Sequence, residues 1–338
     1  MNDILKTKPI SHSSLNLFEY SPLMYKRHVL KELEEEDTTY FRKGNAFDCL
    51  ITEPDKFDEK FIIMNLAPPS GLMERFVETY IEIKEKNDSG LDEDTVLEHC
   101  YTSSQFKLKK ESVLKKFYIP EIQNYITTKL ENKDKTILSQ EEYDKVKGMV
   151  QLLENDERCM SIMQAKDNPM IDVYDQFKIE WIISTKDRSV DARGMLDRLI
   201  IDHTNKKITI VDFKTTGKSI FAFPRSFVQY GYYRQVALYF DAIKYWIANE
   251  KCGLIGYKVI NPIFIVVETN LNHPPMIYKT TDNDLSVGRH GGRLKNSKRL
   301  IKGYYNLIDE LLWHRDNNQW DLPKEALMTG STNLDVFE

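Results

Sequence analysis

Two apolar segments in the second half of the chain limit its possible folds most strongly, because each one carries an aspartate. Residues 192–202 contain Asp197, and residues 207–213 contain Asp212 and are followed directly by Lys214. Both segments have the apolar pattern of β-strands, and a short polar turn separates them. Because strand side chains alternate between faces, Asp212 and Lys214 share one face, and a hairpin can bring Asp197 close to them.

This trio suits one kind of chemistry, the metal-assisted hydrolysis of a phosphodiester. Carboxylate oxygens are the ligands that Mg²⁺ and Mn²⁺ prefer, and a neighbouring lysine can orient the attacking water or help to deprotonate it. The same acid–x–lysine spacing also occurs at Asp58–Lys60, Glu82–Lys84 and Glu131–Lys133, where solvated charge is a sufficient explanation. Spacing alone therefore leaves an exposed ion pair at a strand end as an equal alternative, and only the surrounding apolar runs favour a site.

The rest of the pattern predicts an α/β core that follows a largely helical N-terminal half. Helices are expected over residues 41–53 and 139–153, the second with a capping box of Ser139 and Glu142, and helical propensity continues over residues 72–135. The second half predicts strands at 173–183, 192–202, 207–213 and 257–268, one long helix at 227–249, and mostly helix over 282–313 with breaks at Gly288 and Gly291-Gly292.

The charge balance excludes a chain covered with positive charge, since 47 Lys and Arg residues face 52 Asp and Glu residues, a net charge of −5. A local patch is still sufficient for phosphate binding. The segment 289–299 has no acidic residue and carries five basic ones, namely Arg289, Arg293, Lys295, Lys298 and Arg299. We expect it to contact DNA, with a solvated helix face as an equal alternative.

Several cofactors and locations are not expected. The four cysteines lie far apart with no C-x-x-C pair, so we expect reduced, mostly buried thiols and no zinc or iron–sulfur cluster. No glycine-rich phosphate loop is present, which argues against a bound nucleotide. No apolar run approaches the roughly 20 residues that span a bilayer, and the N-terminus has no apolar signal core. A cytoplasmic protein without a membrane partner is the default expectation.

Six motifs in a fixed order resemble those of a known superfamily. They are residues 10–15 with Ser21-Pro22, residues 44–50 with Glu53-Pro54 and Phe57, Gly194 with Asp197-Arg198, residues 211–216, Gln235 with Tyr239, and residues 320–323. Together they are similar to the PD-(D/E)XK nuclease superfamily and, within it, to the RecB/RecE-like branch that includes exodeoxyribonuclease VIII of prophages. The resemblance covers most of residues 10–323 except roughly 66–135.

The resemblance implies an α/β (α+β) restriction-endonuclease-like core with a central mixed sheet flanked by helices. It implies four parts along the chain. Residues 1–65 would be the N-terminal helical part of the nuclease fold, residues 66–135 a helical insertion, residues 136–325 the nuclease core, and residues 326–338 a C-terminal tail. The role of the insertion is open, since a protein-docking surface or a lid over DNA would both fit.

The resemblance also implies the roles of the site residues. Asp197 and Asp212 would bind the metal together with the backbone carbonyl of Phe213, and Lys214 would be the catalytic lysine. Asp48 stands where relatives of this branch commonly have histidine, and its carboxylate would be a third metal ligand.

Two further residues come from the long helix predicted over residues 227–249. Gln235 would brace the catalytic site or contact the cleaved strand, and Tyr239 would support it and contribute to DNA binding. For both residues, ordinary helix packing is the competing explanation.

The implied function is a Mg²⁺-dependent deoxyribonuclease, with Mn²⁺ as a substitute ion. The branch suggests a 5′–3′ exonuclease that digests linear duplex DNA and leaves 3′ single strands for a strand-annealing recombinase. Such a protein would work as a homo-oligomer in the host cytoplasm of a phage or prophage. Three alternatives remain: an endonuclease or single-strand nuclease on the same scaffold, a module that binds DNA or protein without cutting, and a nuclease that works inside a helicase complex.

Overall fold

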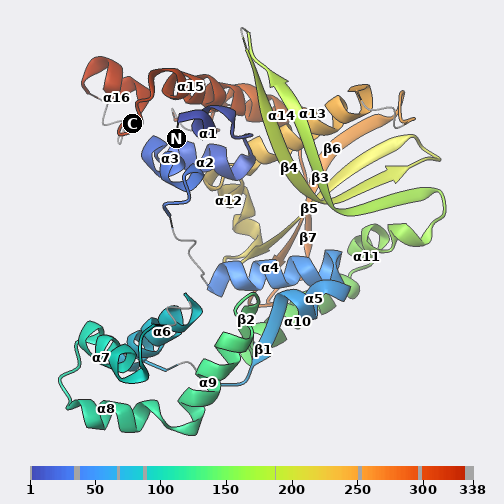
Figure 1. The fold of residues 1–338 in the computed structure, drawn as a ribbon. Helices are drawn as coiled ribbons and strands as arrows, with labels where there is room; N and C mark the ends of the chain where they lie inside the picture. Colours follow the sequence, from blue (N-terminus) through green and yellow to red (C-terminus); the bar gives the residue numbers. More distant parts are fainter. Residues whose placement is uncertain are drawn as a thin grey trace. The chain divides into compact units, whose positions relative to one another are not determined.

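The computed structural model describes residues 2–33, 39–66, 69–86, 90–186, 188–249, 253–295 and 299–331 (Figure 1). The chain divides into two compact units, which are described separately. Unit 1 comprises Met1–Asp37 and Met149–Glu338, and unit 2 comprises Thr38–Gly148. The four-part division expected from the sequence stays a prediction.

A five-stranded mixed sheet forms the centre of unit 1. Its strands, in spatial order, are β3 (Ile171–Ser184), β4 (Ser189–Asp202), β5 (Lys207–Thr216), β6 (Lys258–Glu268) and β7 (Met276–Lys279). Strands β5 and β6 are parallel, and every other neighbouring pair is antiparallel. The predicted α/β class with a central mixed sheet is therefore confirmed.

Strand β5 lies in the middle of this sheet, and its sequence explains why. It is buried almost continuously from Ile208 to Phe213, as expected for a strand covered on both faces. The turn before it is closed by Asp202, whose carboxylate accepts a hydrogen bond from the backbone N–H of Asn205 at 2.9 Å. This places the aspartate of β5 inside the fold.

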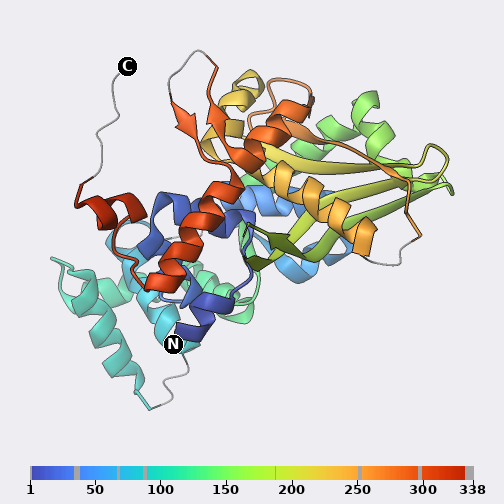
Figure 2. The same cartoon turned by 90° about the horizontal axis from the view of Figure 1, so that it is seen from above.

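Helices flank the sheet, and α13 (Tyr232–Asn249) lies along one face with α14 (Asp282–His290) beside it (Figure 2). The remaining helices of unit 1 are α1 (Asn2–Thr7), α2 (His12–Tyr20), α3 (Pro22–Val29), α11 (Glu157–Met163), α12 (Phe223–Gln229), α15 (Tyr304–Asn317) and α16 (Lys324–Thr329), with short 3₁₀ turns at Ala165–Asp167 and Ile220–Ala222. Apolar side chains of the sheet, α13 and α15 form one continuous core.

Helices α2 and α3 each begin at a serine cap and contribute apolar side chains to this core. The Ser11 side chain accepts a hydrogen bond from the backbone N–H of Ser14 at 3.2 Å, and the Ser21 side chain accepts one from Met24 at 3.3 Å. The last of the six sequence motifs, residues 320–323, also packs here. Its Trp320 is buried and stacks on Tyr25 with ring centroids 5.8 Å apart. Residues at opposite ends of the chain thus close the same core.

Unit 2 is mostly helical and has its own apolar core. It contains α4 (Thr39–Thr52), a 3₁₀ turn at Pro54–Lys56, α5 (Phe57–Lys60), β1 (Phe61–Met64), α6 (Leu72–Glu85), α7 (Glu93–Ser104), α8 (Lys110–Phe117), α9 (Pro120–Glu131), β2 (Thr136–Ser139) and the start of α10 (Gln140–Glu154). The predicted helices and the capping box of Ser139 and Glu142 are confirmed. The parallel pair β1–β2 was not predicted.

One predicted helix is wrong in its extent. The sequence pattern favours a single helix over residues 227–249, whereas α12 ends at Gln229 and α13 begins at Tyr232. Gly231 causes the break, because its φ of +65° is a left-handed conformation that a helix does not contain. The break turns the chain immediately before the helix that carries Gln235.

The segment 282–313 also departs from the prediction. Gly288 does not interrupt a helix, since it is buried inside α14 where that helix packs on α13. The helix ends before Gly291, and a two-stranded hairpin of β8 (Gly292–Arg293) and β9 (Leu300–Ile301) follows. Strand β7 was missed as well, because its four residues are too few for a clear alternating pattern.

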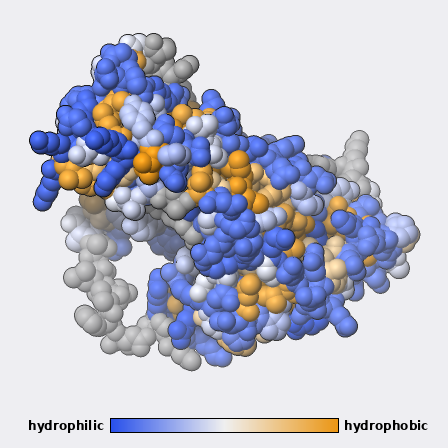
Figure 3. Space-filling view, turned by 90° about the horizontal axis from the view of Figure 1, so that it is seen from below, coloured by the Kyte–Doolittle hydropathy of each residue, from blue (hydrophilic) through white to orange (hydrophobic). Residues whose placement is uncertain are grey.

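The surface in Figure 3 is largely hydrophilic with scattered apolar side chains. Within the described part of the chain, no helix is long and apolar enough to cross a membrane. Cys49, Cys100 and Cys159 are free and buried, as expected, and Cys252 lies outside the described residues.

Candidate active site

The second half of β5 carries Asp212 and Lys214 on one face of the sheet. Asp212 is almost completely buried, and its carboxylate forms an ion pair with the Lys214 ammonium group. That ammonium group also lies 3.4 Å from the backbone oxygen of Phe213 and 5.1 Å from the centre of the Tyr232 ring. Lys214 is thus fixed by a carboxylate, a carbonyl and an aromatic face.

Asp197 comes from the neighbouring strand β4 and lies next to this pair. Its carboxylate accepts a hydrogen bond of 2.8 Å from the backbone N–H of Phe213, the residue between Asp212 and Lys214. The β4–β5 hairpin register, in which Arg198 is opposite Val211, produces this approach. The structure therefore brings together the three residues that the sequence singled out, while their chemical roles stay predictions.

Helix α13 adds Gln235 and Tyr239 to the same face. The side-chain amide of Gln235 donates hydrogen bonds to Asp212 at 3.0 Å and to the Tyr239 hydroxyl at 3.5 Å. Tyr239 approaches β4 closely, since a Cβ atom at Gly194 would lie only 2.8 Å from its ring. The absence of a side chain at Gly194 is therefore what lets α13 reach the two aspartates.

The electrostatics of the site follow from two carboxylates placed together away from water. Burial and then the neighbouring Asp212 carboxylate raise the pKa of Asp197 to about 7. Burial also raises the pKa of Asp212, although Lys214 opposes that shift. Burial alone would lower the pKa of Lys214, but the carboxylates of Asp212 and Asp197 outweigh it and hold that pKa above its ordinary value.

These residues fit a divalent cation. The two carboxylates share a single lysine, so part of their mutual repulsion remains uncompensated. The Gln235 side-chain oxygen is buried and has no hydrogen-bond partner in the described structure. The backbone carbonyl of Phe213, the residue between Asp212 and Lys214, lies 3.4 Å from the Lys214 ammonium group. Four hard oxygen donors of this kind match the preference of Mg²⁺. Among the residues that the structure describes, no cluster of three or more His, Cys, Asp or Glu side chains could hold a metal ion.

Arg198 follows Asp197 in the chain but serves the opposite face of the sheet. It is almost completely buried and forms a bidentate ion pair with Asp175 of β3, with N–O distances of 2.6 and 3.0 Å. Its guanidinium group also lies 5.6 Å from the centre of the Phe213 ring. We therefore interpret the arginine of this motif as a structural support beneath the site.

The other predicted residues lie elsewhere. Asp48 is half-buried on α4 of unit 2, so its place among the metal ligands stays a prediction. Arg289 forms a bidentate ion pair with Asp241 at 2.6 and 2.7 Å, which uses its charge inside unit 1. The remaining basic residues of the 289–299 segment are Arg293, Lys295 and Arg299, which are exposed, and Lys298, which lies outside the described residues.

Two further side chains lie at the site. Tyr232 places its ring beside Lys214, and His12 of α2 places Nε2 3.0 Å from the backbone oxygen of Gly231. Burial first, and then the nearby charges of Arg234 and Lys214, lower the pKa of His12 to about 3, despite its contact with Gly231. The contact joins positions more than 200 residues apart, and no local pattern reveals it.

A mixed sheet with two strand-borne aspartates, an Asp–x–Lys pair and a bracing glutamine defines the PD-(D/E)XK nuclease fold. The chain belongs to the family described as a PDDEXK-like domain of unknown function (DUF3799), whose model matches residues 11–302. This match confirms the superfamily that the sequence motifs resemble.

The solved structures that match this chain include the following two proteins. A protein from Eubacterium rectale described as "Putative exonuclease" is 11% identical, with a TM-score of 0.46, and the match covers 98% of this chain and 91% of that one. The protein described as SSO0001 is 9% identical, with a TM-score of 0.28, and the match covers 88% of this chain and 85% of that one. No curated protein matches the sequence.

Proposed function

We propose that this protein is a metal-dependent deoxyribonuclease that hydrolyses phosphodiester bonds at the site of Asp197, Asp212 and Lys214. One observation carries the proposal. Two carboxylates and a lysine from adjacent strands meet at one place, where the Phe213 N–H holds Asp197 and the Gln235 amide holds Asp212. A merely structural ion pair would not need a second buried carboxylate beside it.

The metal ligands in this proposal are Asp197, Asp212 and the Phe213 carbonyl, with Gln235 offering its unpartnered oxygen. Asp48 is proposed as a further ligand from the motif alone. Bound Mg²⁺ or Mn²⁺ supplies charge neutralisation at the phosphate and a bound water of lowered pKa. The chain itself supplies a fixed arrangement of donors, so little reorganisation is needed when substrate arrives.

Lys214 is proposed to act in its charged form. The two carboxylates keep it protonated, so it can donate a hydrogen bond to the attacking water or to the non-bridging phosphate oxygen. Its contacts with the Phe213 carbonyl and the Tyr232 ring hold it at the edge of the carboxylate pair. Orientation and charge stabilisation are therefore the roles that the geometry supports best, and proton abstraction is not needed.

The finer function rests on the resemblance to the RecB/RecE-like branch. We propose digestion of linear duplex DNA in the 5′–3′ direction, with 3′ single strands as products for a strand-annealing recombinase. A homo-oligomer, a phage or prophage setting and a cytoplasmic location belong to the same proposal. Tyr239 and the basic residues Arg289, Arg293, Lys295, Lys298 and Arg299 are its proposed DNA contacts, with Arg289 the weakest because Asp241 already binds it.

The test compares DNA substrates under otherwise identical conditions. Purified protein is incubated with linear duplex DNA labelled at one 5′ end, with the same duplex labelled at a 3′ end, with a closed circular duplex and with a single strand. Each reaction is run with Mg²⁺, with Mn²⁺ and with EDTA. Early release of 5′-labelled nucleotide from linear duplex alone, only with metal, is the expected result.

Other outcomes correct the proposal in defined ways. Cleavage of the circle indicates an endonuclease, and preference for the single strand indicates a single-strand nuclease. Early release of the 3′ label reverses the polarity. Absence of cleavage with either metal, while DNA is still bound, favours a non-catalytic module or a nuclease that needs a partner.

A further inference from the structure

A cleft of about 420 Å³ lies in unit 1 between α2, the turn that joins α12 to α13, and β9. Its lining includes Glu19, Tyr20, Tyr230, Arg234 and Arg299. None of these residues belongs to the carboxylate and lysine site described above. The cleft therefore needs its own explanation.

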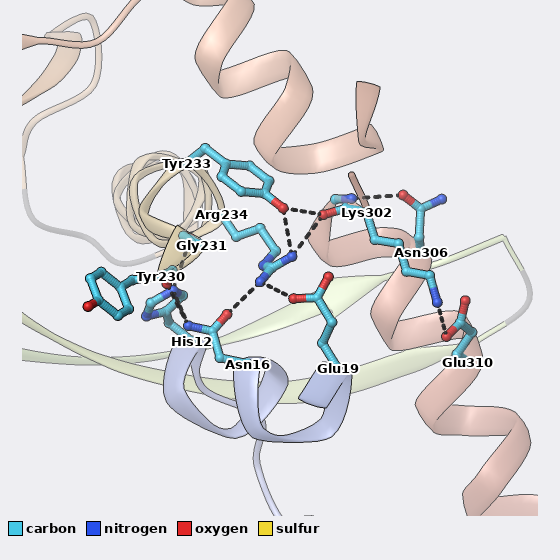
Figure 4. A network of polar contacts seen from close by, with 11 residues as sticks. His12, Asn16, Glu19, Tyr230, Gly231, Tyr233, Arg234, Lys302, Asn306 and Glu310 are labelled. Atoms are coloured by element: carbon cyan, nitrogen blue, oxygen red, sulfur yellow. Dashed lines mark hydrogen bonds and ion pairs between the residues drawn. The ribbon is translucent and has the colours of Figure 1, made fainter. Parts of the chain in front are cut away.

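The floor of the cleft is a fixed polar network around the buried side chain of Arg234 (Figure 4). Its guanidinium group donates hydrogen bonds to Asn16 at 2.7 Å, to the backbone oxygen of Lys302 at 3.0 Å and to the Tyr233 hydroxyl at 2.7 Å, and it pairs with Glu19. Its Nε is buried with no hydrogen-bond partner in the described structure. These bonds hold the arginine rigidly.

The charge of the lining favours an anion. The lining carries two arginines, Arg234 and Arg299, and one acidic residue, Glu19, which pairs with Arg234. Arg299 is exposed at the edge, where a phosphate of a bound chain can reach it.

Two aromatic rings flank this charge. Tyr20, the last residue of α2, has 82% of its surface exposed, and Tyr230 has 44% exposed. A single exposed aromatic ring needs no explanation. Two such rings beside a basic cleft form the arrangement that proteins use to stack the bases of a single strand while they contact its backbone.

The cleft is connected to the catalytic lysine by ring contacts. The Lys214 ammonium group lies 5.1 Å from the centre of the Tyr232 ring, and that ring lies 5.7 Å from the Tyr230 ring. Asn16 donates a hydrogen bond of 2.8 Å to the backbone oxygen of Tyr230, while His12 contacts Gly231. Helix α2 thus fixes the turn that presents Tyr230 next to the site.

We propose that this cleft binds unpaired nucleotides of the DNA strand adjacent to the bond that is cut, with a base stacked on Tyr230 and a phosphate at Arg299. This inference rests on the nuclease function proposed above and adds the substrate feature that the site recognises. An unpaired base is required because the faces of bases inside a duplex are covered by their neighbours. A strand that enters the cleft has therefore separated from its complement.

The test is the binding of a fluorescein-labelled hexathymidylate to the full-length protein, followed by fluorescence anisotropy in EDTA so that no cleavage occurs. Tyr230→Ala should weaken binding about tenfold or more, because loss of base stacking on an aromatic ring has an effect of this size. Tyr230→Phe should bind like wild type, since it keeps the ring. Tyr174→Ala is the matched control, because this tyrosine of β3 is 43% exposed and does not line the cleft.

A second measurement addresses the phosphate. Arg299→Ala should lower the slope of log Kd against log salt concentration by about one, as expected for the loss of one phosphate contact. The proposal is overturned if wild type does not bind the oligonucleotide, if Tyr230→Ala binds as tightly as wild type, or if Tyr174→Ala loses as much affinity. If Arg299→Ala leaves the salt dependence of Kd unchanged, Arg299 is excluded as a phosphate contact of the cleft.

Binding and cleavage are measured separately, so the cleft and the nuclease activity can be rejected independently of each other. Binding that depends on Tyr230, together with no cleavage of any substrate, sustains the cleft and rejects the nuclease. Cleavage by wild type, together with binding that ignores Tyr230, sustains the nuclease and rejects the cleft.

Discussion

At the scale of single residues, neighbours in the chain serve opposite faces of the sheet. Asp197 points to the face that holds Asp212, Lys214 and Gln235, whereas Arg198 points to the other face and pairs with Asp175. This alternation is a direct consequence of strand geometry. It means that adjacent substitutions in one motif should have different effects, one on catalysis and one on stability.

Removing the partner of Arg198 should destabilise the protein. Asp175→Ala leaves a buried arginine without its carboxylate, which typically costs about 3 kcal/mol or more, or about 6–12 °C in melting temperature for a unit of this size. The double variant Asp175→Ala with Arg198→Met should recover much of the loss, since no buried charge remains. Thermal unfolding followed by circular dichroism measures both, and equal melting temperatures for wild type and Asp175→Ala would contradict the interpretation.

Gly194 should tolerate no side chain, because a Cβ atom there lies 2.8 Å from the Tyr239 ring. Gly194→Ala is expected to cost about 1–3 kcal/mol through overpacking and to displace the glutamine beside Asp212. Combining it with Tyr239→Leu should restore stability, whereas Gly90→Ala, which meets no atom within 4 Å, should be near neutral. Urea denaturation checks this, and a stable single variant at position 194 would show that α13 can shift freely.

At the scale of whole elements, local patterns predicted much of the fold. The capping box at Ser139, the strand pattern around Asp197 and the apolar run before Lys214 can all be recognised from short stretches of consecutive residues. Four features were missed because they depend on distant contacts, on very short segments or on single residues. They are the parallel pair β1–β2, strand β7, the hairpin β8–β9 and the helix break at Gly231.

The same distinction holds for the site. The pairing of Asp212 with Lys214 follows from strand alternation, and the approach of Asp197 follows from a hairpin. The contact of His12 with Gly231 could not be predicted, since the packing of α2 against the turn before α13 decides it. Sequence reasoning therefore named Gln235 and Tyr239 beside the two aspartates and the lysine, but it did not identify His12.

The contact between α2 and the Gly231 turn should make stability depend on pH. An unfolded histidine has a pKa near 6.5, and His12 has a pKa of about 3 in the fold, so below pH 6.5 the unfolded chain binds a proton that the folded chain does not. The contribution of neutral His12 to the free energy of unfolding is fully present above pH 6.5 and is lost as the pH falls from 6.5 towards 3.

Substitution of His12 tests this direction of the pH dependence of stability. Melting temperatures of wild type and His12→Gln are compared between pH 7.5 and pH 4.5, with the exposed His99→Gln as a control. The His12 variant should lose less stability on acidification than wild type, because it cannot bind the extra proton when unfolded. Parallel curves for wild type and His12→Gln would reject a histidine held neutral at this turn.

At the scale of the whole molecule, the two units have separate cores, and the carboxylate site lies entirely in unit 1. The net charge of −5 gives no general attraction for DNA, so binding must depend on local groups such as the arginines of the cleft. A cation at the site would add to this by neutralising two buried carboxylates.

Metal binding should therefore stabilise the folded chain. Mg²⁺ at 100 times its dissociation constant is expected to add about 2.7 kcal/mol by mass action, seen as a rise in melting temperature in differential scanning fluorimetry. Asp212→Asn should abolish the rise, while Asp191→Asn, an exposed aspartate on the same strand as Asp197, should keep it. A rise of the same size in all three proteins would place the ion elsewhere.

The central claim is that the carboxylates and Lys214 form a nuclease site, and the most direct test is the initial rate of Mg²⁺-dependent DNA cleavage in matched variants. Lys214→Ala and Asp212→Asn should each lower the rate at least about 100-fold while the protein remains folded. Lys207→Ala, an exposed lysine at the other end of β5, should stay within a few-fold of wild type. Cleavage by Lys214→Ala and Asp212→Asn at the wild-type rate would contradict the account.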